Sequence, residues 1–348
     1  ARAQGGVHPR WLNRGVAGIG VASFFSDVSH EVPTALLPAL LTSTLGAPAA
    51  ALGVIEGVAD GVAGAAKLAG GALADDPANR RATAMGGYTA TAILSALIGV
   101  AQTVWQVGVL RTGAWLTRGL RTPSRNALLT DVVPREAYGR AYGFERAMDN
   151  LGAIVGPLLA LGLIAVIGLR EAILLSVIPG LLATAAIFVA IRSTPRLERH
   201  ERPPLRLKIR PVLRGELGRL LLAVSAFELG NVATTLLILR ATDLLTPERG
   251  HDSAVKVAII LYAAYNLAAT LASVPAGHAT DRRGGVAVLF AGVVIILVAY
   301  GGFALTGSSI AVLALLFAAA GVGIGLTETA EHAAVATLAP ENLRGSAF

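Results

Sequence analysis

Two carboxylates lie inside one long apolar stretch of this chain, where an ionised side chain is costly. Asp27 and Glu31 are four positions apart in the stretch 14–42, so on a helix they share one face. Asp27 comes thirteen residues after the start of the stretch, which on an α-helix places it roughly 20 Å along the axis. Glu228 takes a comparable place in the stretch 217–245. Carboxylates that face each other across a cavity can carry a proton or bind a cation, but each can also pair with a base or cap a broken helix.

A second set of polar residues lies in other apolar stretches. Arg118 lies near the middle of one of them, and its guanidinium can hold a carboxylate of the protein or of an anionic substrate. Glu328, Glu331 and His332 share a helix face and could handle protons or substrate, or form a gate between two halves. Their spacing matches no recognised metal motif, so no metal site is predicted. Residues that could hydrogen-bond a substrate, or equally well cross-link helices, are Asn231, Tyr262, Tyr265 and Asn266.

The remaining charged residues in apolar stretches are interpreted as structural ion networks. One group is Glu56, Asp60 and Lys67, and in it we expect the lysine to neutralise an acidic neighbour. The other group is Glu145, Arg146 and Asp149.

The elements that must position these side chains are membrane helices. The chain has 348 residues, of which 54% are hydrophobic and 15% charged, and its mean hydropathy is +0.64. A soluble domain carries about 25% charged residues, and the apolar runs here reach the roughly 20 residues that a spanning helix needs. The sequence therefore predicts an all-α polytopic membrane protein. The ten expected spans are 14–42, 49–74, 82–103, 105–130, 139–167, 170–191, 217–245, 254–280, 285–306 and 309–337. The first contains Pro33 and Pro38, so we expect it to bend or break there.

Several kinds of chemistry are not expected. The chain has no cysteine, which excludes disulfides and thiol chemistry. It has no phosphate-cradling glycine loop, zinc motif or nucleophile elbow, so we predict no cofactor, no enzymatic activity and no ATP-driven transport by this chain alone. The net charge of +7 is not taken as a sign of nucleic-acid binding, because the basic residues lie where membrane topology places them.

Arginine placement predicts the orientation. With the N-terminus inside, the inner segments carry many more basic residues than the outer ones, as the positive-inside rule requires. We therefore expect a cytoplasmic N-terminus. The inner residues are Arg2, Arg10, Arg14, Arg80, Arg81, Arg135, Arg140, Arg282, Arg283, Arg344 and the basic stretch 192–219, against Arg170, Arg249 and Lys256 outside.

One polar connection divides the chain. The stretch 192–216 is rich in proline and charge and is interpreted as a cytoplasmic linker with room for a short surface helix. The predicted organisation is an N-terminal bundle of six spans, 1–191, the linker, and a C-terminal bundle, 217–348, with four spans.

An internal repeat relates the two bundles. Gly71 to Asp75 matches Gly277 to Asp281, and 134–141 matches 340–347, in both cases 206 residues later. Transporters are often built from such repeats. Because 134–142 leads into the fifth span, 340–348 should lead into an eleventh, so we expect ten helices of a twelve-helix architecture. The alternative is a true ten-helix protein.

These motifs resemble a known family. Gly277-x-x-x-Asp281-Arg282-x-Gly284 resembles the signature loop of the major facilitator superfamily. Gly71 to Asp75 is its equivalent, although Asp76 replaces the usual arginine. Gly152-x-x-x-Gly156-Pro157 resembles the motif of drug/proton antiporters in that superfamily. Other strings resemble a prokaryotic branch of it, which implies the inner (plasma) membrane of a prokaryote.

The resemblance implies two bundles that rock around a central cavity lined by the first, fourth, seventh and tenth spans. It also implies that Asp75 and Asp281 anchor contacts between the halves at the cytoplasmic side. Because two spans are expected to be missing, the first loop is expected to lack one of its partners. Gly152, Gly156 and Pro157 are expected to permit close helix packing or a bend.

Together these features predict a secondary transporter, proton-coupled, that moves a small organic molecule, with efflux of a drug-like compound or metabolite favoured. The alternatives are an uptake symporter or uniporter for a metabolite, and a non-transporting receptor with the same fold. A polar cavity reaching Asp27 and Glu228 would favour a transporter, and an apolar centre a receptor. The expected partners are substrate, protons and lipid, with no nucleic acid, and we expect a monomer.

Overall fold

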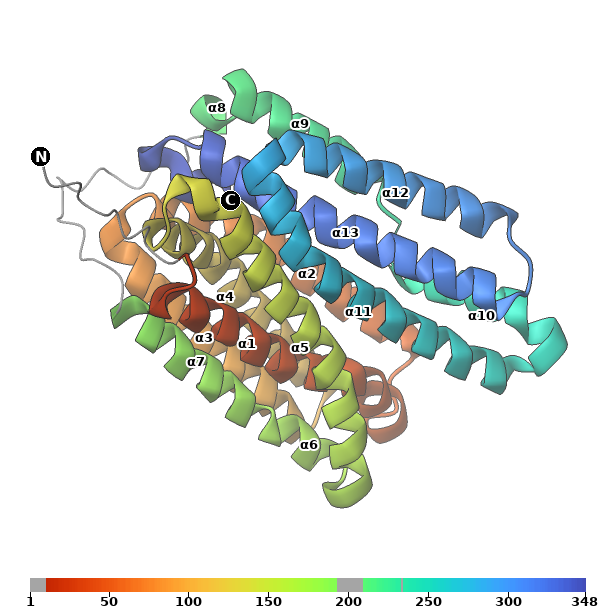
Figure 1. Ribbon diagram of the computed structural model, residues 1–348. Coiled ribbons are helices and arrows are strands. Elements are labelled where there is room, and N and C mark those ends of the chain that lie inside the picture. The colour runs from red at the N-terminus through yellow and green to blue at the C-terminus, as the bar shows by residue number, and fades with distance from the viewer. Residues whose placement is uncertain (1–10, 193–208, 233) are drawn as a thin grey trace, which may run out of the picture.

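The computed structural model describes residues 11–192, 209–232 and 234–348 (Figure 1). All regular secondary structure in this part of the chain is helical. The first half comprises α1 (Arg14–Ala39), α2 (Ala49–Ala74), α3 (Pro77–Leu97), α4 (Val104–Asp131), α5 (Tyr138–Ile167), α6 (Leu169–Leu175) and α7 (Val177–Arg192). The second half comprises α8 (Ile209–Val212), α9 (Gly215–Gly230), α10 (Thr234–Arg249), α11 (His251–Arg283), α12 (Gly285–Leu305), α13 (Ile310–Leu338) and α14 (Arg344–Ala347).

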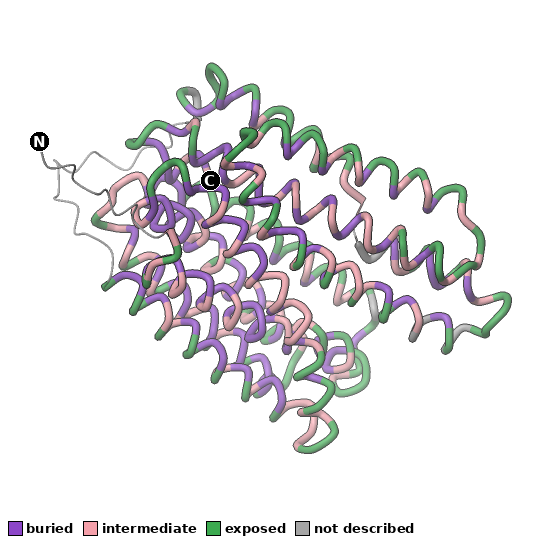
Figure 2. The backbone as a smooth tube through the Cα atoms, viewed as in Figure 1, coloured by how far each residue is buried: buried purple, intermediate pink, exposed green. Residues whose placement is uncertain are grey.

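The predicted all-α fold is confirmed, and the expected spans correspond to these helices. Of the predicted linker, residues 193–208 lie outside the described residues, and α8 is the short helix that follows them. By length and composition, six of the described helical segments could cross a membrane. Large apolar side chains are exposed on them, with Val166 at 81% and Leu305 at 90%, and exposed residues lie along the outer sides of the bundles (Figure 2). In a bilayer these side chains would face lipid.

Two expected spans are each divided into two helices. The sixth breaks at Ser176, because Pro179 has no N–H to donate to the carbonyl four residues earlier. The Ser176 carbonyl accepts a hydrogen bond from Ser29 of α1 at 2.7 Å. The seventh span is not continuous from 217 to 245 as predicted. It ends at Gly230, a weak helix former, and the Asn231 side chain accepts a hydrogen bond from Tyr300 of α12 at 2.8 Å.

The expected break in the first span is absent. Helix α1 continues through Pro33 and Pro38 to Ala39 and then widens into a π-turn, Leu40–Thr44. The Thr34 hydroxyl donates to the His30 carbonyl at 2.7 Å, so a side chain in the proline-containing turn supplies a hydrogen bond to the backbone.

The two halves meet at one end and diverge toward the other (Figure 1). We call the end where α1 begins, and where α2 joins α3 and α11 joins α12, the basic end. There α5 packs against α11 and α13, and α14 packs against α2 and α4. The repeat extends to the helices, because α4 begins at Val104 and α13 at Ile310, 206 residues later.

Two pseudo-equivalent caps hold the basic end together. The Asp281 carboxylate accepts hydrogen bonds from the backbone N–H of Gly139 at 2.6 Å and from Arg140 Nε at 2.7 Å. The Asp75 carboxylate accepts from the Ser346 N–H at 2.9 Å and its hydroxyl at 2.6 Å. Both aspartates thus cap the N-terminus of a helix in the other half. The first loop therefore has Ser346 as a partner, and the expectation that it lacks one further partner stays a prediction.

Glycines permit this approach. A side chain on Gly139 would collide with the backbone of Gly277, and one on Gly345 with that of Gly71. Gly284 has φ +86°, the left-handed region that favours glycine, and makes the turn from α11 to α12.

One other residue of the signature loops, Asp76, acts locally. Asp76 caps its own helix α3 through the Ala78 N–H at 2.9 Å, which gives a physical role to the residue that departs from the signature. Arg282 is exposed in the last turn of α11.

Candidate functional site

A cavity of about 600 Å³ lies between the two halves. Helices α1, α2, α4 and α5 line it on one side, and α9 and α13 line it on the other. It reaches both Asp27 and Glu228, the arrangement expected of a transporter rather than of a receptor with an apolar centre. Its charged lining residues are Asp27, Asp60, Lys67, Arg118, Arg121, Arg125, Arg146, Asp149, Glu228, Glu328 and Glu331.

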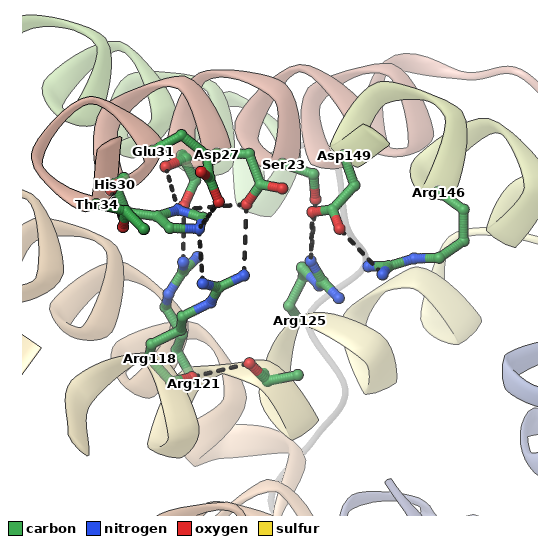
Figure 3. Close-up of polar contacts among 12 residues, drawn as sticks. Ser23, Asp27, His30, Glu31, Thr34, Arg118, Arg121, Arg125, Arg146 and Asp149 are labelled. Carbon is green, nitrogen blue, oxygen red and sulfur yellow. Dashed lines mark hydrogen bonds and ion pairs between the residues drawn. The ribbon is translucent and has the colours of Figure 1, made fainter. Parts of the chain in front are cut away.

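Asp27 belongs to a buried polar cluster on α1 (Figure 3). Its carboxylate lies 3.5 Å from Arg118 Nη2 and 3.4 Å from His30 Nδ1. Glu31 lies one turn later, with its carboxylate 3.4 Å from His30 Nε2. The two predicted carboxylates therefore share a histidine as well as a helix face. Glu31 is 26% exposed but does not line the cavity.

His30 is the site residue that the sequence interpretation missed. Its Nδ1 lies 2.9 Å from the Ser26 carbonyl, and its Nε2 lies 2.7 Å from Arg118 Nη1. A neutral imidazole with its proton on Nδ1 satisfies both contacts, because Arg118 can only donate. A histidine between two acids in an apolar stretch was a usable signal, since buried ionisable groups in membranes are costly and need partners.

A row of arginines on α4 faces α1. Arg111 pairs with Glu56 of α2 at 3.0 Å, Arg121 donates to the Ser26 hydroxyl at 2.7 Å, and Arg125 pairs with Glu145 at 2.7 Å. The spacing of the row keeps the guanidinium groups on one side of the helix. Arg118 is one of the arginines that α4 contributes to the cavity, and 32% of its side-chain surface remains exposed there.

The expected ion network on α5 is present. Glu145 is 1% exposed and also lies 2.8 Å from Arg146 Nε. Arg146 pairs with Asp149 at 3.0 Å and reaches Glu328 of α13 at 4.0 Å. The network thus extends from the first half to the second inside the cavity.

Gly152 and Gly156 set the approach of α5 to α1. A Cβ on Gly152 would lie 2.7 Å from the Cβ of Asp27, and one on Gly156 would lie 2.5 Å from the Cβ of Glu31. The predicted role in close helix packing therefore falls at the two acidic positions. Pro157 lies inside α5, directly after Gly156.

The second half supplies the opposite wall. Glu228 of α9 and Glu328, Glu331 and His332 of α13 all line the cavity. His332 Nδ1 lies 2.8 Å from its own helix carbonyl at Glu328, and its ring stacks on Phe348 at a centroid distance of 6.1 Å. Among the described residues, Glu331 has no ion pair within 4.0 Å.

Other predicted substrate residues lie outside the lining. Asn231 joins α9 to α12 through Tyr300. Tyr262 and Tyr265 of α11 stack on each other at 6.0 Å, and Asn266 donates to the Tyr262 carbonyl at 3.2 Å. Their roles toward a substrate stay predictions.

On α2, Asp60 accepts from Trp115 Nε1 at 2.8 Å. Lys67 is exposed and makes no ion pair within 4.0 Å among the described residues. The acidic neighbour with which its charge interacts is Glu331 of α13. In the same part of the chain, no three His, Asp or Glu side chains gather as a metal-holding group.

Comparison with known proteins identifies related chains. The profile of the Major Facilitator Superfamily matches residues 19–348. An uncharacterized MFS-type transporter from Methanocaldococcus jannaschii is 27% identical over 97% of this chain and 84% of its own length. A homologue of the multidrug resistance efflux pump PmrA from Lactococcus lactis is 32% identical over 87 residues, which is 25% of this chain and 22% of that protein. The resemblance to drug antiporters is therefore limited to part of the chain.

A solved structure shares the fold. A bacterial homologue of the iron transporter ferroportin in an outward-facing state superposes with a TM-score of 0.70. The match covers 96% of this chain and 87% of that one at 15% identity. At that identity the likeness concerns the fold alone.

Proposed function

The chain belongs to the Major Facilitator Superfamily, a family of membrane transporters and not of enzymes, and from that premise we propose that it is a proton-coupled exporter of a small organic molecule. The observation that carries the proposal is the polar cavity between the halves, which joins Asp27 of α1 to Glu228 of α9. A cavity of about 600 Å³ lies in the range of small-molecule sites.

The arrangement of the halves supports alternating access. They are held together by the two aspartate caps at the basic end and diverge toward the other end (Figure 1). With the predicted cytoplasmic N-terminus, this is an outward-facing state. Export then requires the caps to open, so that substrate can enter from the cytoplasm. The proposed setting is the inner membrane of a prokaryote, with the chain acting as a monomer.

Asp27 is the proposed proton carrier. It lines the cavity and pairs with Arg118 and His30. A proton taken from water on the outer side would neutralise the Asp27 carboxylate, remove one negative charge from the cavity and weaken its hold on a cationic group of the substrate, so that the substrate is released outside. Loss of that proton to the cytoplasm would restore the charge, so that the next substrate molecule can bind there. Glu31 and Glu228 are proposed as the neighbouring proton acceptors, because one shares His30 with Asp27 and the other faces it from the second half.

Export is favoured over uptake by the packing of α5. Gly152, Gly156 and Pro157, which resemble the antiporter motif, bring α5 against α1 at Asp27 and Glu31. The partial similarity to a multidrug efflux pump homologue points the same way.

The test uses the purified chain in proteoliposomes containing a trapped pH indicator. Compounds that raise the melting temperature of the protein, and so bind its folded state, are added across a pH gradient. We expect the unmodified chain to move protons when such a compound is present, and Asp27→Asn to bind the same compound without proton movement. Glu171→Gln, an exposed acid in α6 outside the cavity lining, is the control. Unchanged proton movement in Asp27→Asn would reject the carrier role.

A further inference from the structure

The lysine and arginine residues of the cavity all lie on one of its two walls, and the acidic residues lie on both. Its five lysine and arginine residues all come from the first half: Lys67, Arg118, Arg121, Arg125 and Arg146. The second half contributes acids, namely Glu228, Glu328 and Glu331, together with His332. The first wall therefore carries every lysine and arginine side chain of the lining, together with the carboxylates of Asp27, Asp60 and Asp149, while the second wall carries carboxylates and an imidazole without any lysine or arginine.

Positions that the repeat relates also differ in charge between the two walls. Helices α4 and α13 are related by the offset of 206 residues and line the cavity from opposite sides. The position of Arg125 in α4 is occupied in α13 by Glu331, and that of Thr122 by Glu328. Equivalent sites in the two halves thus differ in charge. The two walls therefore come from related halves but present different charges to the cavity.

Most charges of the first wall already have partners in their own half. Arg125 and Arg146 share Glu145 and Asp149, and Arg118 is paired with Asp27. Lys67 makes no ion pair within 4.0 Å among the described residues, and the acid with which its charge interacts, Glu331, belongs to the other half. The Lys67 amine and the exposed guanidinium of Arg118 are therefore the groups best placed to receive an anion.

The second wall has unmatched acids. Within the described part of the chain, neither Glu228 nor Glu331 has a cation within 4.0 Å. Glu228 receives a long hydrogen bond of 3.4 Å from Asn231, and Glu328 has only the distant Arg146 at 4.0 Å. A charge taken out of water is costly without a partner, so closing the cavity around these groups requires the occupant to supply positive charge on this side.

We propose that the transported molecule is a zwitterion, whose anionic group binds at Lys67 and Arg118 and whose cationic group binds at Glu331 and Glu228. The inference rests on the proposed function in taking this cavity as the transport site. Lys67 and Glu331 attract each other across the cavity but make no ion pair within 4.0 Å, so a molecule between them meets both charges. A simple cation there would be repelled by Lys67, and a simple anion would be repelled by the glutamates. A molecule with both charges neutralises both walls. Its body would pass Trp115, which Asp60 holds in the lining.

The experiment measures binding to the purified full chain without a pH gradient. The probes are ω-amino acids of increasing length, from glycine to 8-aminooctanoate, each compared with the alkylamine and the alkylcarboxylate of the same chain length. We expect an ω-amino acid of suitable length to raise the melting temperature and to bind about tenfold or more tightly than either single-charge analogue, the size of effect given by one charged hydrogen bond.

Two variants test which residue binds each charged group of the zwitterion. In Glu331→Gln the zwitterion should bind no more tightly than the carboxylate, and in Lys67→Gln no more tightly than the amine. Neither replacement breaks an ion pair among the described residues, so both variants should fold. Glu171→Gln should keep the preference for the zwitterion.

Equal or tighter binding of the amine or the carboxylate at every length would overturn the proposal, and so would the absence of any response to all three series. The preference is measured at equilibrium, so it does not depend on proton coupling. A chain that prefers zwitterions but moves no protons would contradict the proposed function and leave this inference standing.

Discussion

His30 contacts three charged residues of the site. Its imidazole contacts Asp27 and Glu31 on its own helix and accepts from Arg118 of α4. With only 3% of its surface exposed, it is an internal connection and not a residue free in the cavity. Neither acid could replace it, because a carboxylate cannot donate to the Ser26 carbonyl while accepting from Arg118 unless it is protonated.

Replacement of His30 should therefore destabilise the fold. His30→Leu leaves the Arg118 guanidinium without its acceptor at 2.7 Å, and we expect the free energy of unfolding to fall by about 1–3 kcal/mol. The measurement is thermal unfolding in detergent. His278→Leu is the matched control, because His278 makes the same own-helix contact at 3.0 Å but is exposed, and its cost should stay within about 0.5 kcal/mol. Equal losses in both variants would contradict the role given to His30.

The contrast between predicted and missed site residues has a physical cause. Counting along a helix gives depth and face, which is why Asp27, Arg118, Glu228, Glu328 and His332 could be predicted to approach one cavity. Which neighbour a face meets depends on packing, which sequence spacing does not contain. The contact of Asn231 with Tyr300 of α12 belongs to that second kind.

At the scale of elements, long apolar runs were sufficient to place the spans. Ends and breaks were harder, because they depend on hydrogen bonds between helices. Pro33 does not end α1, whereas the Gly230–Asn231 pair ends α9, with the Asn231 side chain bonded to Tyr300 of a distant helix. Proline and glycine are both poor helix formers, so helix propensity alone does not tell where a helix ends. The hydrogen bonds that the segment makes with other helices decide it.

The packing of α5 on α1 gives a prediction at this scale. Gly152→Ala would place a methyl group 2.7 Å from the Cβ of Asp27 and 2.6 Å from the Phe24 carbonyl. We expect this overpacking to lower the free energy of unfolding by about 1–3 kcal/mol and to reduce proton movement in the vesicle assay. Gly162→Ala is the control on the same helix, since nothing lies within 4 Å of its new methyl group.

The control should be neutral or stabilising by up to about 1 kcal/mol, because alanine is the better helix former. If Gly152→Ala were as well tolerated as Gly162→Ala, the contact between α5 and the acidic face of α1 would not be a close one.

At the scale of the whole molecule, the repeat produces two matching contacts at one end. Asp281 caps α5 through Gly139 and Arg140, and Asp75 caps α14 through Ser346, the position 206 residues after Arg140. Each contact joins a loop of one half to a helix of the other. Because both lie at the basic end, they stabilise the state in which that end is closed, and they must break when it opens.

Removing both caps should shift the molecule toward the opposite access state. Each Asp→Asn change at Asp75 and Asp281 removes charge-assisted hydrogen bonds worth about 1.5–3 kcal/mol, and every 1.4 kcal/mol changes a two-state equilibrium by about tenfold. The chain has no cysteine, so spin labels at Gln102→Cys and Gly307→Cys, two exposed loop positions at the diverging end of the two halves, report one distance without background labelling.

We expect the distance between the two labels to be shorter in the double variant, because the far end closes as the basic end opens. Asp76→Asn is the control, since that residue caps α3 within its own half, and it should leave the distances unchanged. A double variant with the distances of the unmodified chain would mean that the packing of α5 on α11 alone holds the basic end shut. The aspartates would then serve only to order their helix ends.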